Sequence, residues 1–117
     1  MHEAAIVKSL IDQVEEMFVT GAITGRVLRV HLKVGKLTAV VPDVMRFMFD
    51  AAIPDTKLAG ARMTMDEIQV SAKCNACGAV DDILDIGFYC GSCGSTDIDV
   101  ISGRELMIDS VEVEDGD

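Results

Sequence analysis

The sequence predicts an α+β fold, in which a small three-stranded sheet with two helices is interrupted by a zinc-ribbon module. Two segments repeat hydrophobic residues at helical spacing, three segments alternate as strands do, and two C-x-x-C pairs stand between the last two of these strands. We therefore expect an α/β domain formed by residues 1–72 and 104–117, and a ribbon domain formed by residues 73–103. A chain of 117 residues has room for one compact core and one small insertion.

The first two elements are a helix and a strand. Ile6, Leu10 and Val14 recur at the spacing of the buried face of an amphipathic helix, which we expect to end near Gly21. From Val27 to Val34, hydrophobic and polar residues alternate, which is typical of a strand with one buried face. The residues expected on that face are Leu28, Val30, Leu32 and Val34.

A second helix should share the core with the first. Pro42 suits the first turn of a helix because its missing N–H has no partner there, and Pro54 stops the helix. The stripe that we expect to be buried consists of Val44, Phe47, Met48, Ala51 and Ala52.

Two later segments alternate but change phase partway. In residues 61–72 the change falls at Asp66-Glu67, and in residues 105–114 it falls near Asp109-Ser110. One extra residue in a β-bulge restores a single buried face, so we interpret each segment as one bulged strand. Together with residues 26–34, they are expected to form the three-stranded sheet.

The four cysteines of the chain form two C-x-x-C knuckles, Cys74 with Cys77 and Cys90 with Cys93, separated by twelve residues. A glycine follows each knuckle, and glycine adopts the positive φ that a turn around a metal often needs. Two such turns can complete a tetrahedral four-sulfur site, for which zinc is the expected metal. Because a closed shell has no open position, this zinc is expected to be structural.

The segment between the knuckles holds few hydrophobic residues, so the metal should supply much of the ribbon's folding free energy, on the order of 10 kcal/mol for structural zinc. Short strands of the ribbon are expected at Ile83-Leu84, Ile86, and Ile98, Val100 and Ile101.

The same knuckles suit other chemistries. An iron centre uses the same four ligands, so the sequence leaves a small iron electron carrier open. Structural disulfides need an oxidising compartment, and the polar start of the chain does not resemble a secretory signal. A redox-active dithiol needs one pair, whereas this chain has two that match. We therefore expect the four cysteines to bind zinc and the protein to be cytoplasmic.

Charge is distributed unevenly along the chain. Residues 1–73 hold nine Lys/Arg and nine Asp/Glu, whereas residues 74–117 hold one Arg and eleven Asp/Glu. No basic residue lies between Cys74 and Gly103, so the ribbon lacks the cations that nucleic-acid phosphates require. No apolar run approaches the roughly 20 residues of a membrane span. We expect neither a nucleic-acid nor a membrane partner.

The chain begins Met1-His2-Glu3, which offers a second metal site. A bulky residue at position 2 predicts that Met1 is retained with a free amine. That amine, the backbone nitrogen of His2 and the His2 imidazole can close two chelate rings around one metal, and the Glu3 backbone nitrogen or an outside ligand fills the fourth place. Planar nitrogen coordination suits Ni(II) and Cu(II). Taken alone, this dipeptide is a weak signal.

The combined features resemble the HypA/HybF family, the nickel metallochaperones of NiFe-hydrogenase maturation. The resemblance rests on Met1-His2-Glu3 running into a helix, Val34-Gly35 closing the first strand, Phe47-Met48-Phe49-Asp50, the paired knuckles and the acidic last strand, and it covers essentially the whole chain.

This resemblance implies several expectations. Met1, His2 and Glu3 would bind transferable Ni(II), with His2 as the essential side chain, in the domain of residues 1–72 and 104–117. The four cysteines would hold structural Zn(II). The expected partners are a HypB-type GTPase and the hydrogenase large subunit, with urease as a second acceptor in some organisms, and the protein would be a monomer or a homodimer. His31 lies between Arg29 and Lys33 on the polar face of its strand, where we expect it to have no metal role.

One rival function remains open at the level of sequence. A zinc-ribbon adaptor could dock a basic partner through its acidic ribbon without transferring metal, with Met1-His2 incidental. Enzymatic activity is not expected, since the sequence shows no nucleophile triad, no Gly-rich phosphate loop and no open-shell metal motif.

Overall fold

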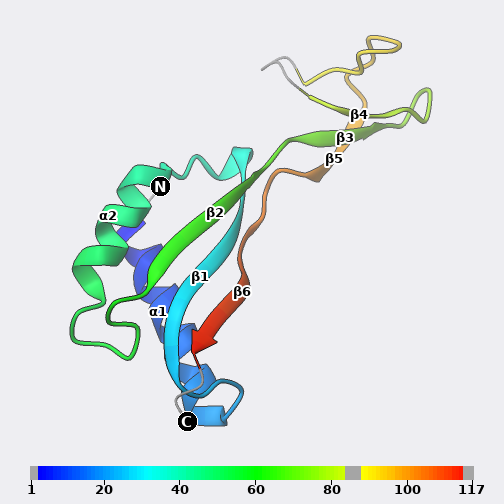
Figure 1. Cartoon of the computed structure of the whole chain (residues 1–117). Helices are drawn as coiled ribbons and strands as arrows, with labels where there is room; N and C mark the ends of the chain where they lie inside the picture. The colour runs from blue at the N-terminus through cyan, green and yellow to red at the C-terminus, as the bar shows by residue number, and fades with distance from the viewer. Residues whose placement is uncertain (1–2, 84–87, 115–117) are drawn as a thin grey trace. The chain divides into compact units, whose positions relative to one another are not determined.

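The computed structural model of the chain describes residues 3–83 and 88–114 (Figure 1). In chain order, the elements are α1 (Glu3–Thr20), β1 (Arg26–Gly35), the 3-10 turn η1 (Lys36–Thr38), α2 (Pro42–Ala52), β2 (Arg62–Ile68), β3 (Ser71–Cys74), β4 (Val80–Asp82), β5 (Ile98–Ser102) and β6 (Leu106–Glu114). The strands form two three-stranded sheets, ordered β2-β1-β6 and β4-β3-β5. The α+β fold and the three-stranded sheet with two helices are confirmed.

The chain folds as two compact units. One comprises Met1–Lys33, Val40–Asp66 and Met107–Asp117, and the other comprises Val34–Ala39 and Glu67–Leu106. The first therefore holds the two helices and the second holds the β4-β3-β5 sheet with the knuckles. The expected functional division at residues 72/73 and 103/104 stays a prediction. Within the part of the chain that the structure describes, no helix is long and apolar enough to cross a membrane.

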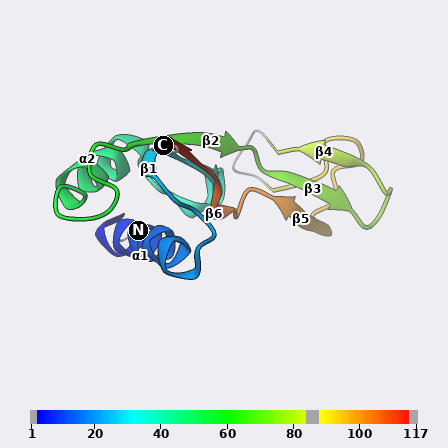
Figure 2. The same cartoon turned by 60° about the horizontal axis from the view of Figure 1, so that its bottom comes forward.

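In the first unit, α1 and α2 pack together, and α1 lies along one face of the β2-β1-β6 sheet (Figures 1 and 2). The core forms because the helices and β1 each turn one hydrophobic face inward. Leu10 and Val14 are buried as expected. Other fully buried side chains of this core are Val7, Val27, Val30, Leu32, Met45, Phe49 and Leu58.

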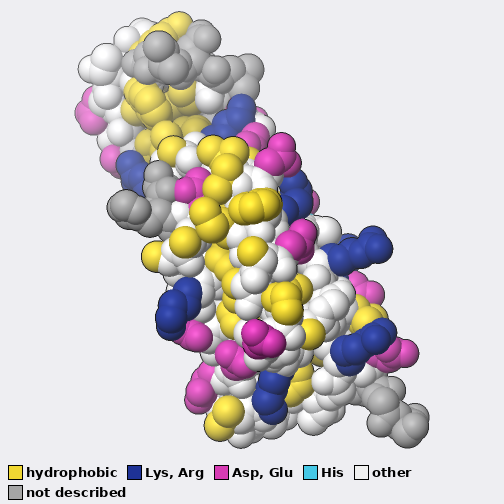
Figure 3. Space-filling view, turned by 90° about the vertical axis from the view of Figure 1, so that its left-hand side faces the viewer, with side chains coloured by type: hydrophobic (Ala, Val, Ile, Leu, Met, Phe, Trp, Pro, Cys, Tyr) yellow, Lys and Arg dark blue, Asp and Glu magenta, His cyan; other side chains and the backbone are white. Residues whose placement is uncertain are grey.

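The expected buried stripe of α2 is wrong, because Phe47 has an exposed fraction of 71% and Ala51 and Ala52 are also exposed. The helix buries Met45 and Phe49 instead, one turn apart. Two overlapping apolar stripes run along α2, and the sequence pattern does not say which of them faces the core. Phe47 and Val41 are exposed, and Figure 3 shows a face of the molecule on which hydrophobic side chains lie among charges of both signs.

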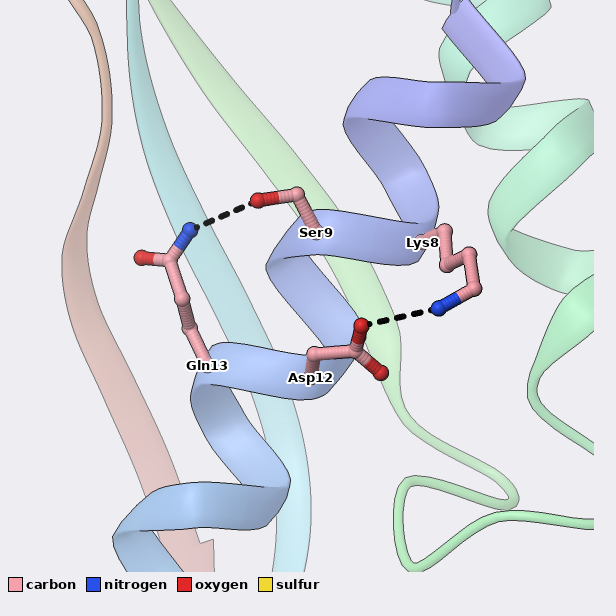
Figure 4. A network of polar contacts seen from close by, with 4 residues as sticks. All are labelled: Lys8, Ser9, Asp12 and Gln13. Atoms are coloured by element: carbon pink, nitrogen blue, oxygen red, sulfur yellow. Dashed lines mark hydrogen bonds and ion pairs between the residues drawn. The ribbon is translucent and has the colours of Figure 1, made fainter.

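The outer face of α1 is polar and carries side-chain pairs one turn apart (Figure 4). The Lys8 ammonium lies 3.0 Å from an Asp12 carboxylate oxygen, and the Gln13 amide donates to the Ser9 hydroxyl at 3.2 Å. Exposed pairs of this kind stabilise a helix by only about 0.2–0.5 kcal/mol each. They complete the amphipathic pattern, but burial of the other face holds the helix in place.

Residues 61–72 are not one bulged strand, and this prediction is wrong. They form β2 and β3, which belong to different sheets. The chain leaves the first sheet after Ile68 and enters the second at Ser71, so the change of phase marks the passage between sheets. Met63 and Ala72 are each buried, but in different sheets.

Strand β6 lies beside β1, and three ion pairs between them indicate its direction. Arg26 pairs with Glu114 at 3.0 Å, Arg29 with Glu112 at 3.2 Å, and Lys33 with Asp109 at 3.4 Å. Because the numbers rise along β1 as they fall along β6, the two strands are antiparallel. Burial along β6 changes phase at Asp109-Ser110, both exposed, while the bulge expected there stays a prediction.

The end of β1 approaches the segment that joins β5 to β6 closely. The amide of Gly35 donates to the carbonyl of Glu105 at 2.7 Å, and the amide of Leu37 donates to the carbonyl of Gly103 at 2.8 Å. A Cβ atom on Gly35 would lie 2.1 Å from the carbonyl carbon of Gly103. Only glycine fits at position 35, because backbone rather than a movable side chain fills the space.

We predict that Gly35→Ala lowers the free energy of unfolding by about 2 kcal/mol or more, because the added methyl forces two backbone segments apart. Urea unfolding followed by circular dichroism measures the loss. Gly91→Ala is the matched control, since nothing lies within 4 Å of its Cβ position. Its effect should stay within about 0.5 kcal/mol, and equal losses in the two variants would contradict the steric explanation.

Candidate metal centre

The structure brings the four cysteine sulfurs together. All four lie within 4.8 Å of one another, and all four cysteines are free. The sulfurs of Cys74 and Cys93 are 3.6 Å apart, as are those of Cys77 and Cys90, so each knuckle contacts the other. Sulfurs around a tetrahedral zinc, with Zn–S of about 2.3 Å, stand about 3.8 Å apart. The cluster is therefore a four-sulfur cation site, as the spacing predicts.

The two knuckles have the same backbone geometry. Gly78 donates its amide to the carbonyl of Cys74 at 2.9 Å, and Gly94 does the same to Cys90 at 2.8 Å. The φ angles of these glycines are 79° and 77°, in the region that glycine adopts without steric cost. The amides of Cys74 and Cys90 each donate to the carbonyl five residues further on, at 2.8 Å in both cases. The repeated turn presents the sulfurs of both knuckles to one point.

Strand pairing fixes the first knuckle. Cys74 is the last residue of β3, which pairs with β4 on one side and with β5 on the other, where Cys74 stands opposite Ile98. The ribbon strands expected at Ile98, Val100 and Ile101 are confirmed as β5, whereas Ile83 follows the end of β4. Of the expected pieces, Leu84 and Ile86 lie outside the described residues.

Asn75 supports the first knuckle in a way that sequence reasoning missed. Its side-chain amide donates to the carboxylates of Asp97 at 3.1 Å and Asp99 at 3.3 Å, and its backbone amide donates to the Asp97 carbonyl at 2.9 Å. These bonds tie the turn to the start of β5. The only signal in the sequence is a polar amide between the cysteines of a knuckle, opposite acidic residues that are 22 and 24 positions away.

The first cysteine of each knuckle is the more acidic one. The amide of Cys77, followed by weaker contributions, lowers the pKa of Cys74 below its ordinary value. The amide of Cys93 and that of the residue before it lower the pKa of Cys90 to about 6. Both thiols are buried, and these amides stabilise their thiolate forms despite the desolvation.

The second cysteine of each knuckle is less acidic. The amide of Ala79 lowers the pKa of Cys77. The thiols of Cys90, in the opposite knuckle, and of Cys74, in the same knuckle, outweigh that effect and raise the pKa above its ordinary value. In the same way the amide of Ser95 lowers the pKa of Cys93, while neighbouring thiols raise it to about 12. Four sulfurs this close cannot all ionise without a cation, and a bound cation removes that restriction.

The predicted nickel ligands fall mostly beyond the described part of the chain. Met1 and His2 lie outside it, and Glu3 is the first residue of α1. The Glu3 carboxylate accepts a hydrogen bond from the amide of Val41, with Oε2 3.4 Å from the nitrogen. Sequence reasoning missed this contact, although a signal existed, since Val41-Pro42-Asp43 opens a helix without a local capping side chain.

His31 is half-buried, and both nitrogens of its ring contact side chains of the same chain. Its Nδ1 lies 2.5 Å from the Thr64 hydroxyl, and its Nε2 lies 3.0 Å from an Asp66 carboxylate oxygen, both on β2. Because both ring nitrogens are engaged, His31 links β1 to β2. Among the described residues, the four cysteines form the one cluster of metal-ligating side chains, and His31 is not part of it.

Comparison with known proteins identifies the family. A family model described as "Hydrogenase/urease nickel incorporation, metallochaperone, hypA" matches residues 1–113, a span that includes both Met1-His2-Glu3 and the two knuckles. The chain belongs to the HypA family. This family acts in hydrogenase maturation and nickel incorporation, so the protein is a maturation factor and not a catalytic enzyme.

Individual relatives match this chain over most of their lengths. The chain is 40% identical over 115 residues to the hydrogenase maturation factor HypA of Desulfatibacillum aliphaticivorans, covering 98% of this chain and 88% of that one. It is 39% identical over 118 residues to HypA of Chlorobium limicola, covering 100% of both. The solution structure of the nickel metallochaperone HypA from Helicobacter pylori shares the fold, with a TM-score of 0.68 at 22% identity and 97% of each chain covered.

We predict that a divalent cation loaded into the metal-free HypA ribbon releases more protons as the pH falls. Cys93, with a pKa of about 12, always gives up a proton, whereas Cys90, with a pKa of about 6, gives one up only when the solution is acidic enough to protonate it. Protons then compete with the cation, so its affinity falls with pH and falls more steeply below about pH 6. Isothermal titration in buffers of different ionisation enthalpy counts the protons. An equal count at about pH 8 and about pH 5 would contradict these thiol assignments.

Proposed function

We propose that this protein is a nickel metallochaperone that binds Ni(II) at Met1-His2-Glu3. With a partner GTPase of the HypB type, it delivers the metal to the large subunit of NiFe hydrogenase, and to urease where that enzyme is present. The observation that supports the proposal is the match of the HypA family model to residues 1–113, a span that includes Met1-His2-Glu3 and both knuckles. The chemistry of each motif supports it independently.

The cysteines suit a resident metal, for which we propose structural Zn(II). Four thiolates close the coordination shell and leave no position for a substrate or an acceptor ligand. Cys74 and Cys90 are buried, so an acceptor could not reach all the ligands in turn. A metal held this way stabilises the fold and is not handed on.

The N-terminus suits a transferable metal. An amine, a backbone nitrogen and an imidazole favour planar Ni(II) over zinc. Ligands at a chain end can be removed one at a time by an acceptor, which a chaperone requires. Because the nitrogen ligands must lose protons, nickel affinity should fall as the pH drops through the histidine range.

A zinc-ribbon adaptor is the alternative. The acidic ribbon favours it, since the ribbon carries Asp81, Asp82, Asp97 and Asp99 and no basic side chain lies between Cys74 and Gly103. Under this alternative, the ribbon docks a basic protein surface and the N-terminus binds no nickel. Titration with nickel separates the two functions.

We predict that the native protein binds about one Ni(II) per chain, while a His2→Ala variant and a variant with a short N-terminal extension bind far more weakly. The extension removes the free amine without changing any side chain, so it serves as the matched test of the chelate. Competition with a coloured nickel indicator gives the three affinities. Equal binding by all three proteins would overturn the nickel site and leave the adaptor.

We also predict that the purified protein is colourless and holds about one zinc per chain. Chelation should unfold residues 71–102 and leave the helices and the β2-β1-β6 sheet folded, because few apolar side chains are buried in the described part of the ribbon. Metal analysis and amide NMR of the metal-free protein measure these outcomes. A red protein with an iron absorption band would instead indicate an electron carrier.

A further inference from the structure

The N-terminus of α2 has no cap of its own. Val41 is the N-cap residue, its carbonyl accepts from the amide of Met45 at 3.0 Å, and its side chain has no polar atom to offer. In a capping box, a Glu or Gln three residues into the helix reaches back to the amide of the N-cap residue. Here that position is Val44, which cannot accept a hydrogen bond. Any protein acceptor for the amide of Val41 must therefore come from outside α2.

The acceptor comes from the other helix. Glu3, the first residue of α1, places Oε2 3.4 Å from the Val41 nitrogen, across 38 positions of sequence. The bond is at the long end of the range of N–H···O hydrogen bonds. Asp43, the acid in the first turn of α2, pairs with Arg46 at 3.3 Å and does not bond the Val41 amide.

We propose that the Glu3 carboxylate caps α2 from α1, and that this bond, rather than direct coordination, is how the Glu3 side chain contributes to nickel capture. The proposal rests on the nickel function proposed above. Glu3 is then a positioning residue, whose backbone nitrogen is free to bind nickel while its side chain anchors the start of α1. An anchored chain loses less conformational freedom when the chelate closes.

Two substitutions separate capping from coordination. Glu3→Gln keeps a carbonyl oxygen that can cap, as Gln does in a capping box, but an amide is a poor metal ligand. Glu3→Ala removes the acceptor altogether. Glu16→Ala is the matched control, because Glu16 is an exposed carboxylate on the same helix.

The first readout is solvent exchange of the Val41 amide, measured by NMR in protein without nickel. Glu3→Ala should speed exchange about three- to tenfold, while Glu3→Gln and Glu16→Ala leave it nearly unchanged. Unchanged exchange in Glu3→Ala would overturn the cap. This result does not depend on nickel binding, so it is distinct from any failure of the proposed nickel site.

The second readout is nickel affinity. Glu3→Ala should weaken binding about three- to tenfold and Glu3→Gln should restore most of it. Val41→Pro, which removes the donor and keeps the Glu3 carboxylate, should weaken binding as much as Glu3→Ala, and combining the two changes should add nothing further. Val41 has φ of −94° and ψ of 112°, an extended conformation from which proline needs a change in φ of about 30°. Equal losses in Glu3→Ala and Glu3→Gln with Val41→Pro unaffected would show direct coordination and overturn the proposal.

Discussion

Mutual repulsion among four sulfurs is the constraint on which the ribbon depends. The sulfurs lie within 4.8 Å of one another, and the neighbouring thiols raise the pKa of Cys93 to about 12 while amides lower that of Cys90 to about 6. A divalent cation reverses this conflict by making every thiolate favourable. Among the described residues from 67 to 106, few apolar side chains are buried besides Val70, Ala72 and two of the cysteines. We therefore expect metal binding to stabilise the ribbon, as burial of apolar side chains stabilises the other unit.

The unit that contains the two helices is stabilised by the burial of apolar side chains. Val14, Leu32, Met45 and Phe49 are almost fully buried, and their packing needs no ligand. Ion pairs between β1 and β6 are exposed, so they add little stability. A protein built in this way can lose or exchange metal at one place without unfolding everywhere, which a carrier requires.

The sequence predicted the features that depend on local chemistry and spacing. The knuckles were predictable because a C-x-x-C turn needs only residues within the turn, including glycines with positive φ such as Gly78. The split of residues 61–72 between two sheets was not predictable. A change of phase in the alternation of hydrophobic and polar residues is the same for a β-bulge and for a passage between two sheets. The buried face of α2 was misassigned since Phe47 competes with Phe49 for the core. The contacts of His31 and Glu3 join residues 33 to 38 positions apart and leave no periodic signal.

The proposed division between a fixed and a mobile metal depends on where the ligands stand in the chain. Cys74 and Cys90 each carry neighbours on both sides, with backbone bonds on both flanks of the knuckle, so moving one sulfur strains the turn that holds the other. A ligand at the end of a chain has covalent neighbours on one side only, and it can leave the metal without distorting the helix behind it. An anchor close by reduces the conformational freedom that such a ligand loses on binding. In this structure, the described residue nearest the end is Glu3, and its carboxylate meets the start of α2.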